Sequence, residues 1–233
     1  MNLSQKQFKN CHILVNVDYN EIIDCNWFDK SLWQAQNKIT GSAPGRGSTL
    51  FFTAESENFA LRHYLRGGYA AKLSRDKYIF TGLSNTRAFA ELQLTYKLYA
   101  QNLPVPEPIA ARVVKSRVWY TQDIINRKIL DSTTLYQYII ENPDDHEVWT
   151  KVGKTIAKFH LAGLNHGDLN MRNILVTSSK VYLIDFDKSS LEANETQKQN
   201  NLARLKRSID KELGNSNSFT NLLTGYHQHM DIK

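Results

Sequence analysis

The chain has 233 residues, 41% of them hydrophobic, which is enough for one large domain or for two small lobes with their own cores. Its net charge of +6 is moderate, and no apolar run reaches the roughly 20 residues that a bilayer-spanning helix needs. With no secretory signal at the start, the sequence predicts a cytoplasmic chain, compatible with resting on a membrane surface, in which Cys11 and Cys25 are free thiols outside any metal-ligand spacing.

The first 40 residues indicate packing rather than chemistry. A short strand is predicted at residues 12–17, and a mixed segment follows it. We interpret the aromatic residues of that segment, Trp27, Phe28 and Trp33, as core residues and not as ligand-stacking ones.

A glycine-rich stretch, Gly-Ser-Ala-Pro-Gly-Arg-Gly-Ser-Thr at 41–49, leads into a predicted strand at 50–52. Gly41, Gly45 and Gly47 would let a hairpin backbone approach a bound anion closely, with its amide groups directed at the anion. A plain turn explains the same composition, so this stretch predicts a phosphate-binding loop only in combination with other motifs.

The next predicted strand, residues 58–65, carries a cation that fits nucleotide binding. Alternation places Arg62 on the opposite face from Phe59 and Leu61. Arg62 follows Gly47 by 15 residues, about where a kinase places the strand lysine that binds ATP phosphates. The alternative is a solvated charge on an edge strand.

A helix is predicted at 86–101 from apolar residues at spacings of three and four. Glu91 falls one position off that apolar stripe. In a kinase-like lobe, a helix glutamate pairs with the strand cation that holds the phosphates, so we expect Glu91 to pair with Arg62. An ordinary surface glutamate is the alternative.

Residues 62–77 are rich in basic side chains, interleaved with tyrosines and offset by only one acid. Such a run is compatible with a solvated face, or with binding of an anionic substrate such as lipid phosphates or a sugar acid. Arg66, Lys72 and Arg75 are the residues we expect to dock substrate phosphates. Nucleic acid is not expected as a partner, because the chain has no known nucleic-acid-binding signature.

The middle of the chain predicts the boundary between the two lobes. Residues 103–111 are extended because three prolines alternate there, and an antiparallel pair is predicted at 110–114 and 118–125. We place the hinge at 123–126, where main-chain groups of Asp123 and Ile125 would bind the adenine edge. The predicted domains are an N-terminal nucleotide-binding lobe, 1–125, and a C-terminal catalytic lobe, 126–233.

Helices dominate the predicted second lobe. They are expected at 133–141, beginning from Ser132 or Thr133, at 146–162, capped by Asp144 or Asp145, and at 200–213. In the last of these helices leucine and isoleucine face inward. Arginine and lysine line much of the other side, Arg204 among them, and that side is either a solvated face or a contact for anionic lipid headgroups.

The strongest motif is at 166–187. It reads H-x-D-x-x-x-x-N, an apolar strand, a break, a second apolar strand and D-F-D. Asp168 fits the carboxylate that orients the acceptor hydroxyl and takes its proton. A short hairpin would bring Asn173 and Asp185 side by side, and both offer the oxygen ligands that Mg²⁺ prefers. His166 is expected to support the loop without titrating in catalysis.

The segment after Asp187 bears on the acceptor. Large eukaryotic protein kinases need a long activation segment and extra helices there to hold a peptide. Residues 188–233 are too few for that apparatus and contain no A-P-E sequence. We therefore expect a small-molecule, sugar or lipid acceptor and no peptide substrate.

Taken together, these motifs resemble those of the bacterial 3-deoxy-D-manno-octulosonic acid (Kdo) kinases of the lipopolysaccharide kinase family. The resemblance spans nearly the whole chain. It rests on the segments 41–47, 60–68, 103–111, 168–175, 183–188 and 201–208.

The resemblance implies an α+β, bilobal, protein-kinase-like fold, with a β-rich N-terminal lobe with one main helix and a smaller, mostly helical C-terminal lobe. It implies ATP- and Mg²⁺-dependent phosphorylation of the 4-hydroxyl of Kdo on a lipid A precursor, with Asp168 as the active-site residue. The expected place of work is the cytoplasmic side of the inner membrane, as a peripheral protein. A kinase for another core sugar, such as heptose, and a nucleotide-binding pseudokinase are the alternatives.

Two residues depart from the general kinase pattern. Arg62 stands where protein kinases carry lysine, and an arginine binds phosphate as a planar fork. Asp187 replaces the glycine of D-F-G, which lowers the backbone freedom expected after Asp185. Neither change removes a metal ligand or the base.

Overall fold

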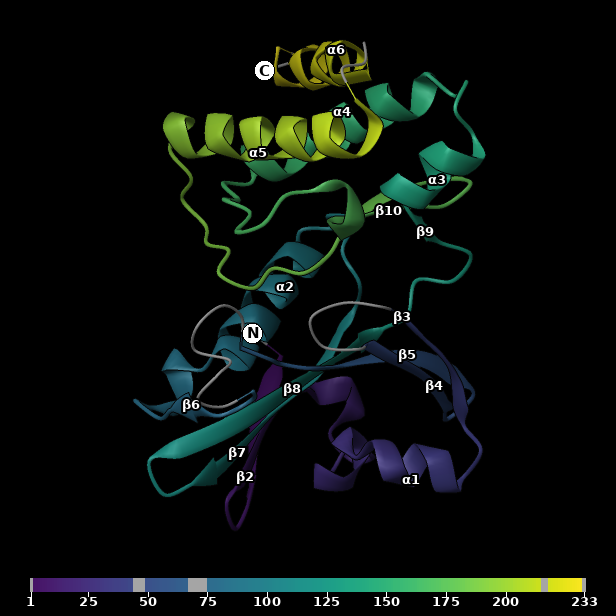
Figure 1. Cartoon of the computed structure of the whole chain (residues 1–233). Coiled ribbons are helices and arrows are strands. Elements are labelled where there is room, and N and C mark those ends of the chain that lie inside the picture. The colour runs from purple at the N-terminus through teal and green to yellow at the C-terminus, as the bar shows by residue number, and fades with distance from the viewer. Residues whose placement is uncertain (1, 44–48, 67–74, 215–217, 232–233) are drawn as a thin grey trace. The chain divides into compact units, whose positions relative to one another are not determined.

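The computed structural model describes residues 2–43, 49–66, 75–214 and 218–231 (Figure 1). The chain divides into two compact units: Met1–Tyr96 with Glu107–Lys128, and Lys97–Pro106 with Ile129–Lys233. The fold is a mixture of a β-sheet unit and a mainly helical unit, as the sequence predicts. Gly45, Gly47 and Lys72 lie outside the described residues.

An antiparallel sheet forms the first unit. Its strands follow the order β1, β2, β7, β8, β5, β4, β3, and β6 pairs with β8. Their bounds are β1 Leu3–Phe8, β2 Cys11–Asn16, β3 Ile39–Ala43, β4 Thr49–Ala54, β5 Glu57–His63, β6 Tyr78–Ile79, β7 Pro108–Ser116 and β8 Trp119–Arg127. The predicted strands at 12–17, 50–52 and 58–65 correspond to β2, β4 and β5, whereas β1 was not predicted.

Both faces of this sheet are buried, because alternate residues of the central strands belong to different clusters. On β2, Ile13 and Val15 join one cluster and Leu14 joins the other. The helix predicted at 86–101 is α2, Arg87–Ala100, and its residues Phe89 and Leu92 cover the second cluster.

The N-terminal aromatic residues cover the first cluster, which confirms their interpretation as core residues. They come from short elements that the sequence does not reveal: η1 (Val17–Tyr19), η2 (Cys25–Phe28) and α1 (Lys30–Ala35). Trp33 stacks on Phe52 with ring centroids 4.3 Å apart, and Trp27 meets Trp33 edge to face. Aromatic pairs of this kind add roughly 0.5–1.5 kcal/mol beyond their buried area.

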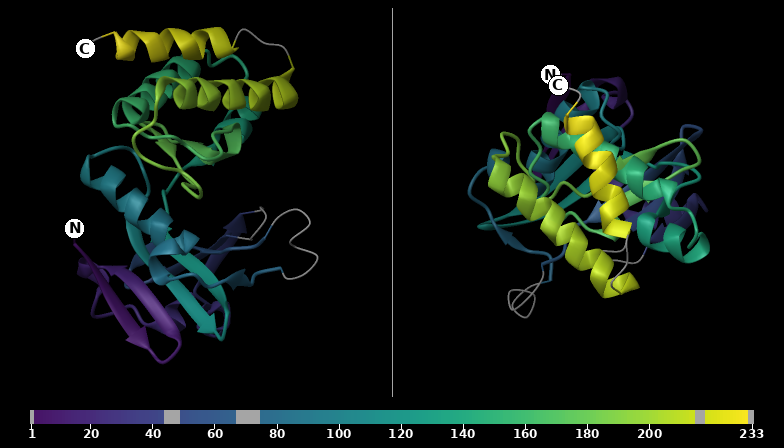
Figure 2. Two further views of the ribbon diagram at one scale, coloured as in Figure 1. Left: turned by 90° about the vertical axis from the view of Figure 1, so that its left-hand side faces the viewer. Right: turned by 90° about the horizontal axis from the view of Figure 1, so that it is seen from above.

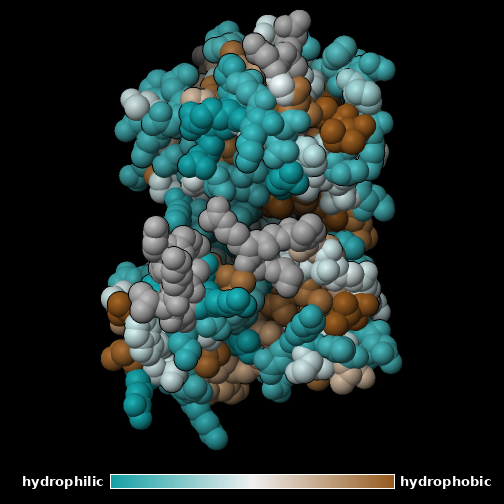
Figure 3. Space-filling model, in the orientation of Figure 1, coloured by the Kyte–Doolittle hydropathy of each residue, from teal (hydrophilic) through white to brown (hydrophobic). Residues whose placement is uncertain are grey.

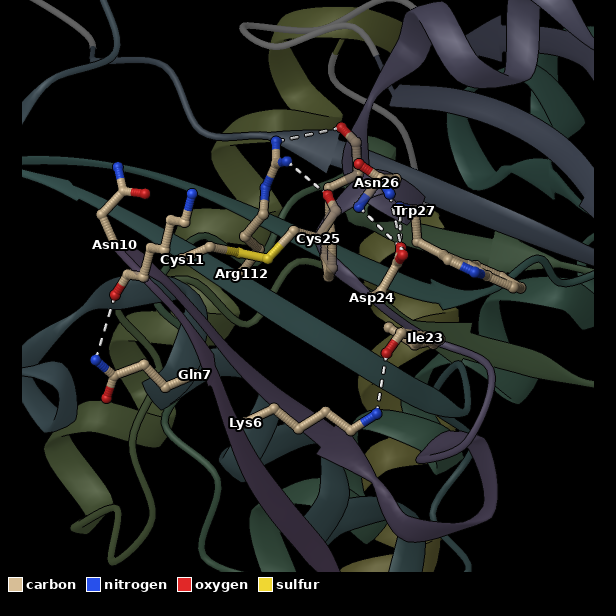
Figure 4. Close-up of a disulfide and its surroundings, with 12 residues drawn as sticks. Lys6, Gln7, Asn10, Cys11, Ile23, Asp24, Cys25, Asn26, Trp27 and Arg112 are labelled. Carbon is tan, nitrogen blue, oxygen red and sulfur yellow. Dashed lines mark hydrogen bonds between the residues drawn. A yellow bond between two sulfur atoms is a disulfide. The ribbon is translucent and has the colours of Figure 1, made fainter.

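The prediction of free thiols is wrong, because Cys11 and Cys25 form a disulfide (Figure 4). Cys11 begins β2, and the chain returns through η1 so that Cys25 begins η2 beside it. Arg112 on β7 fixes this return: its Nη1 donates to the carbonyl oxygen of Cys25 at 2.9 Å. Sheet pairing and this hydrogen bond, which no local motif encodes, bring the two sulfurs together.

The second unit contains four α-helices and a small sheet among its described residues. The helices are α3 (Leu135–Glu141), α4 (Glu147–Leu161), α5 (Glu195–Leu213) and α6 (Ser218–Met230). The strands β9 (Thr133–Thr134), β10 (Ile174–Val176) and β11 (Val181–Leu183) pair in the order β11, β10, β9. The cap of α3 is Thr134 and not the predicted Ser132 or Thr133. At the start of α4, Asp145, one of the two predicted caps, accepts hydrogen bonds from the main-chain amides of Glu147 and Val148.

Helix α6 packs tightly over α4, as both views in Figure 2 show. The contact depends on two glycines. A Cβ on Gly153 of α4 would lie 1.9 Å from the carbonyl oxygen of Leu222, and one on Gly225 of α6 would lie 2.2 Å from that of Thr150. The helix backbones therefore approach more closely than any side chain would allow.

Candidate active site

The loop that carries Asp168 is fixed through its main chain. The main-chain amide of Asp168 donates to Nδ1 of His166 at 3.1 Å, and its carbonyl oxygen accepts from the side-chain Nδ2 atoms of Asn170 and Asn173, each at 2.9 Å. The loop begins after Gly163, which ends α4 with a φ of 82°, and leads into η5 (Met171–Asn173). Because both main-chain groups of Asp168 are bound, its carboxylate projects from a rigid support.

His166 links this loop to the D-F-D segment. Its Nε2 lies 3.1 Å from the carbonyl oxygen of Ile184, and its Nδ1 accepts from the amide of Asp168. Burial lowers the pKa of His166, so the ring is neutral with the proton on Nε2. The geometry agrees with the supporting role expected from the sequence.

Asn173 and Asp185 lie at the ends of paired strands, as predicted. β10 and β11 are antiparallel, and the amide of Ile184 donates to the carbonyl oxygen of Asn173 at 3.0 Å. The side-chain amide nitrogen of Asn173 is bound to the loop, so Oδ1 is the atom of this side chain that fits a metal ligand. Asp185 has a φ of 64°, a left-handed conformation that is uncommon outside glycine and often marks functional sites.

The donor set fits magnesium held jointly with a nucleotide. Within the residues that the structure describes, no group of three or more histidines, cysteines, aspartates or glutamates gathers around a metal position. Mg²⁺ is commonly bound through one or two protein oxygen ligands together with substrate phosphates and water. One amide oxygen and one carboxylate are the kind of incomplete set that this coordination uses.

Asp187, where protein kinases have glycine, causes no backbone strain. The positive φ values in this segment are at Asp185 and at Lys188, 64° and 60°. Phe186 is buried and lies against His166, with ring centroids 5.4 Å apart. An aspartate at position 187 is therefore compatible with the conformation of D-F-D.

In the first unit, Arg62 and Glu91 form the predicted ion pair, at 2.5 Å between Nη2 and Oε2. The hydroxyl of Tyr64 also donates to Glu91, and Nη2 of Arg62 lies 3.1 Å from that hydroxyl. Burial is the main reason why the pKa of Tyr64 lies well above its usual value, so the phenol stays protonated. Gly41, the described member of the glycine stretch, lies at a bulge of β3 opposite Phe51.

The predicted adenine site at Asp123 and Ile125 is not supported by the structure. Strand β8 continues to Arg127, and both residues have strand partners on each side, Asp123 between His63 and Arg112. The Asp123 side chain binds Nδ1 of His63 at 2.7 Å and Nε of Arg112 at 2.9 Å, and Ile125 is a core residue. Their polar groups are used within the sheet, so the predicted hinge lies too early in the chain.

Arg204 is the residue near Asp168 that the sequence did not single out. It lies on α5, and its Nη1 binds Oδ1 of Asp168 at 2.6 Å, although periodicity placed it on the outer side of the helix. Both side chains are about half exposed. The apolar stripe of α5 gives no sign of this contact, because it locates the core and not the loop beside it.

A strand cation paired with a helix glutamate, together with an H-x-D-x-x-x-x-N loop and a D-F-D segment, defines a kinase of the protein-kinase-like class. The chain belongs to the lipopolysaccharide kinase (Kdo/WaaP) family, whose model matches residues 30–226. This confirms the resemblance, the fold class and the kinase activity predicted from sequence. Membership of a kinase family implies ATP as the phosphate donor.

Several relatives carry the name 3-deoxy-D-manno-octulosonic acid kinase. The protein of Vibrio parahaemolyticus is 45% identical over 187 residues, which cover 80% of this chain and 79% of the relative. The protein of Vibrio vulnificus is 39% identical over 231 residues, covering 96% and 98%. That of Haemophilus influenzae is 38% identical over 241 residues, covering 97% and 100%.

A solved structure described as WaaP in complex with acyl carrier protein shares the fold. Its TM-score is 0.55 at 14% sequence identity, and the match covers 85% of this chain and 86% of that one. At this identity the similarity shows the fold alone.

Proposed function

We propose that the chain transfers the γ-phosphate of ATP to the 4-hydroxyl of Kdo on a lipid A precursor, in the synthesis of the lipopolysaccharide core. The observation that carries the proposal is the name shared by relatives that are 38–45% identical over most of the chain. The site agrees with it, because the chain has Asp168 on a hydrogen-bonded loop, and Asn173 and Asp185 beside the paired strands β10 and β11.

The residues have separate tasks in this proposal. Asp168 accepts a hydrogen bond from the acceptor hydroxyl and takes its proton as the bond to phosphorus forms. Asn173 Oδ1 and the Asp185 carboxylate would hold Mg²⁺, which neutralises charge on the phosphates when bound. Arg62, oriented by Glu91, binds phosphate oxygens as a planar fork.

We assign nucleotide binding to the N-terminal unit and the catalytic groups to the C-terminal one, close to the domain division expected from the sequence. Gly41, with Gly45 and Gly47, remains the proposed phosphate-binding loop. The adenine-binding residues are left unassigned, because Asp123 and Ile125 are committed to the sheet.

A peripheral position on the cytoplasmic side of the inner membrane is part of the proposal. None of the helices within the described residues has the length and apolar character needed to cross a membrane. The outer side of α5 carries exposed Arg207 and Lys211, and the region of α5 in Figure 3 is hydrophilic. Such a surface would contact anionic headgroups through charge, and Arg66 and Arg75 of the first unit would dock substrate phosphates.

The test is transfer of label from γ-labelled ATP. Three acceptors are compared: a Kdo-bearing lipid A precursor, the same lipid without Kdo, and a heptose-bearing core. We expect Mg²⁺-dependent labelling of the Kdo-bearing lipid alone, and its near-complete loss in Asp168→Asn with unchanged circular dichroism. Labelling only of the heptose acceptor would make the chain a kinase for another core sugar. ATP binding without transfer to any acceptor would make it a pseudokinase.

A further inference from the structure

One face of α5, from Asn201 to Glu212, contacts the loop that carries Asp168. Asn201, Arg204, Ser208 and Glu212 are spaced by three, four and four residues, which places them on a single side of the helix. Each binds a residue of the segment 165–172. We call these four residues the α5 polar stripe.

The N-terminal member of the stripe, Asn201, fixes the main chain of the loop. Asn201 is 5% exposed. Its Oδ1 accepts from the amide of His166 at 2.8 Å, and its Nδ2 donates to the carbonyl oxygen of His166 at 3.1 Å and to Oδ1 of Asn165 at 3.0 Å. A buried amide with three partners is costly to remove, so this residue serves the structure of the loop.

The C-terminal members of the stripe, Ser208 and Glu212, bind the C-terminal end of the loop. The hydroxyl of Ser208 lies 3.3 Å from the amide of Met171, and Nη2 of Arg172 lies 3.2 Å from each carboxylate oxygen of Glu212. The guanidinium of Arg172 also stacks on the ring of Tyr136, 4.1 Å from its centroid. The loop main chain is therefore tied to α5 on both sides of Asp168.

Arg204 differs from Asn201 and Ser208 because it binds the carboxylate of Asp168 and not the loop backbone. Its side chain is 48% exposed and that of Asp168 is 49% exposed. Exposed ion pairs contribute only about 0–1 kcal/mol to stability. The contact therefore matters little for folding, while it acts on the carboxylate that takes the proton of the acceptor hydroxyl in the proposed reaction.

We propose that Arg204 is a positioning residue, which holds the Asp168 carboxylate in the rotamer that meets the acceptor hydroxyl. This inference rests on the proposed kinase reaction. The loop hydrogen bonds fix the main-chain position of Asp168, but rotation about its side-chain bonds still moves the carboxylate oxygens. The guanidinium removes that freedom by binding Oδ1, and a misplacement of about 1 Å in a reacting group can cost a factor of about 100 in rate.

The chain offers a matched control on the same helix. Lys206 binds Asp210 at 2.7 Å, and the two side chains are 46% and 36% exposed, similar in length and exposure to the Arg204–Asp168 pair. Lys206→Gln removes an equivalent ion pair that touches no residue of the catalytic loop. Arg204→Lys keeps a charge near Asp168 without the fork of the guanidinium.

The first measurement is steady-state kinetics with γ-labelled ATP and the Kdo-bearing acceptor. We expect Arg204→Gln to lower kcat by about 10- to 100-fold, with KM for ATP within about threefold of wild type and Tm within about 2 °C. Arg204→Lys should recover part of kcat, and Lys206→Gln should keep it within about twofold. An unchanged kcat in Arg204→Gln, or a loss confined to KM for ATP, would overturn the proposal.

A second measurement does not depend on activity. In crystal structures of wild type and Arg204→Gln, we expect the main chain of 165–172 to superpose while the Asp168 carboxylate adopts a different rotamer or several. An unmoved carboxylate in the variant rejects the positioning role. Absence of any transfer by the wild type would instead reject the proposed function, and the crystallographic comparison would still decide the role of Arg204.

Discussion

Arg62 on β5 and Glu91 on α2 are 29 positions apart in the chain and are joined by an ion pair of 2.5 Å. The Glu91 side chain is only 3% exposed, whereas that of Arg62 is 21% exposed. A buried carboxylate is costly unless hydrogen-bonded, and here Arg62 and the hydroxyl of Tyr64 supply bonds. The pair therefore fixes the direction of the guanidinium while leaving part of it accessible.

Glu91→Gln tests whether this pair orients Arg62 for nucleotide. The variant keeps the shape of the side chain but removes its charge, so we expect kcat/KM for ATP to fall by about 10- to 100-fold. The free energy of unfolding should fall by about 1–3 kcal/mol, because a buried charge-assisted hydrogen bond is weakened. Kinetics and urea denaturation measure the two effects. Tyr64→Phe, which removes only the hydroxyl, is the control; a Glu91→Gln enzyme with wild-type kcat/KM for ATP refutes the role.

The Cys11–Cys25 disulfide gives a prediction about stability. The bond closes a loop with a sequence separation of 14, for which the chain-entropy model gives about 3 kcal/mol. We expect the Cys11→Ser/Cys25→Ser variant to unfold at lower urea concentration than the oxidised wild type. Added dithiothreitol should lower the wild-type midpoint and leave that of the double variant unchanged. A wild-type midpoint insensitive to the reductant would show that the bond does not stabilise the fold.

The disulfide and Arg204 show where reasoning from sequence stops. Local patterns located β5, α2, α4 and the β10–β11 hairpin, because their periodicity and their bounding turns lie within short windows. The Arg62–Glu91 pair was expected because a kinase pattern fixes the roles of both residues. Cys11 and Cys25 meet through η1 and a hydrogen bond from Arg112, which is 87 residues away from Cys25. No local pattern records such a contact.

The hinge prediction failed for a different reason. The sequence becomes polar after Ile125, and that change was interpreted as the end of the strand. In the structure β8 continues to Arg127, which pairs with Phe59 of β5 and binds Glu107 through its side chain at 3.2 Å. A polar strand residue with partners on neighbouring segments cannot be told from a strand end by sequence alone.

His160 makes stability depend on pH. Burial lowers the pKa of His160 to about 4, and its Nδ1 lies 2.9 Å from the hydroxyl of Tyr226. In the unfolded chain the ring titrates near its ordinary value of about 6.5, so below that pH the unfolded state binds a proton that the folded state does not. Stability should therefore be full above about pH 6.5 and fall by about 3 kcal/mol as the pH decreases to about 4.

Urea denaturation at pH 7, 6, 5 and 4.5 measures this dependence. His160→Gln cannot titrate, so its stability should fall less steeply over the same range. If wild type and variant lose stability in parallel, other groups cause the loss.

The α4–α6 contact predicts a large effect from one methyl group. Gly153→Ala would place Cβ 1.9 Å from the carbonyl oxygen of Leu222 and 2.8 Å from the amide nitrogen of Tyr226. These are backbone atoms, so the helices must separate, and we expect a loss of about 2–3 kcal/mol in the free energy of unfolding. Lys154→Ala, at the neighbouring exposed position of α4, should change stability by less than about 0.5 kcal/mol. Equal stabilities for the two variants would contradict the close packing.

Gly167, between His166 and Asp168, lies against the backbone that follows D-F-D. A Cβ there would be 2.5 Å from the carbonyl oxygen of Asp187 and 2.9 Å from that of Lys188. Protein kinases have arginine at this position of H-R-D and glycine at the third position of D-F-G, whereas this chain has glycine in the loop and Asp187 in the second motif. In this chain the glycine that permits the close approach of the two motifs is therefore Gly167 of the catalytic loop, and not the third residue of D-F-D.

Gly167→Ala should therefore act on catalysis more than on folding. The added methyl group must push the loop away from residues 187–188, which displaces Asp168 relative to Asp185, and we expect kcat to fall by about 100-fold or more. The amide of Gly167 also donates to Oγ of Ser189 at 2.9 Å, so Ser189→Ala separates the loss of that hydrogen bond from the steric effect. We expect Ser189→Ala to keep kcat within about threefold of wild type. A Gly167→Ala enzyme with wild-type kcat would mean that the loop tolerates the displacement, and that the spacing between Asp168 and Asp185 is not fixed by this contact.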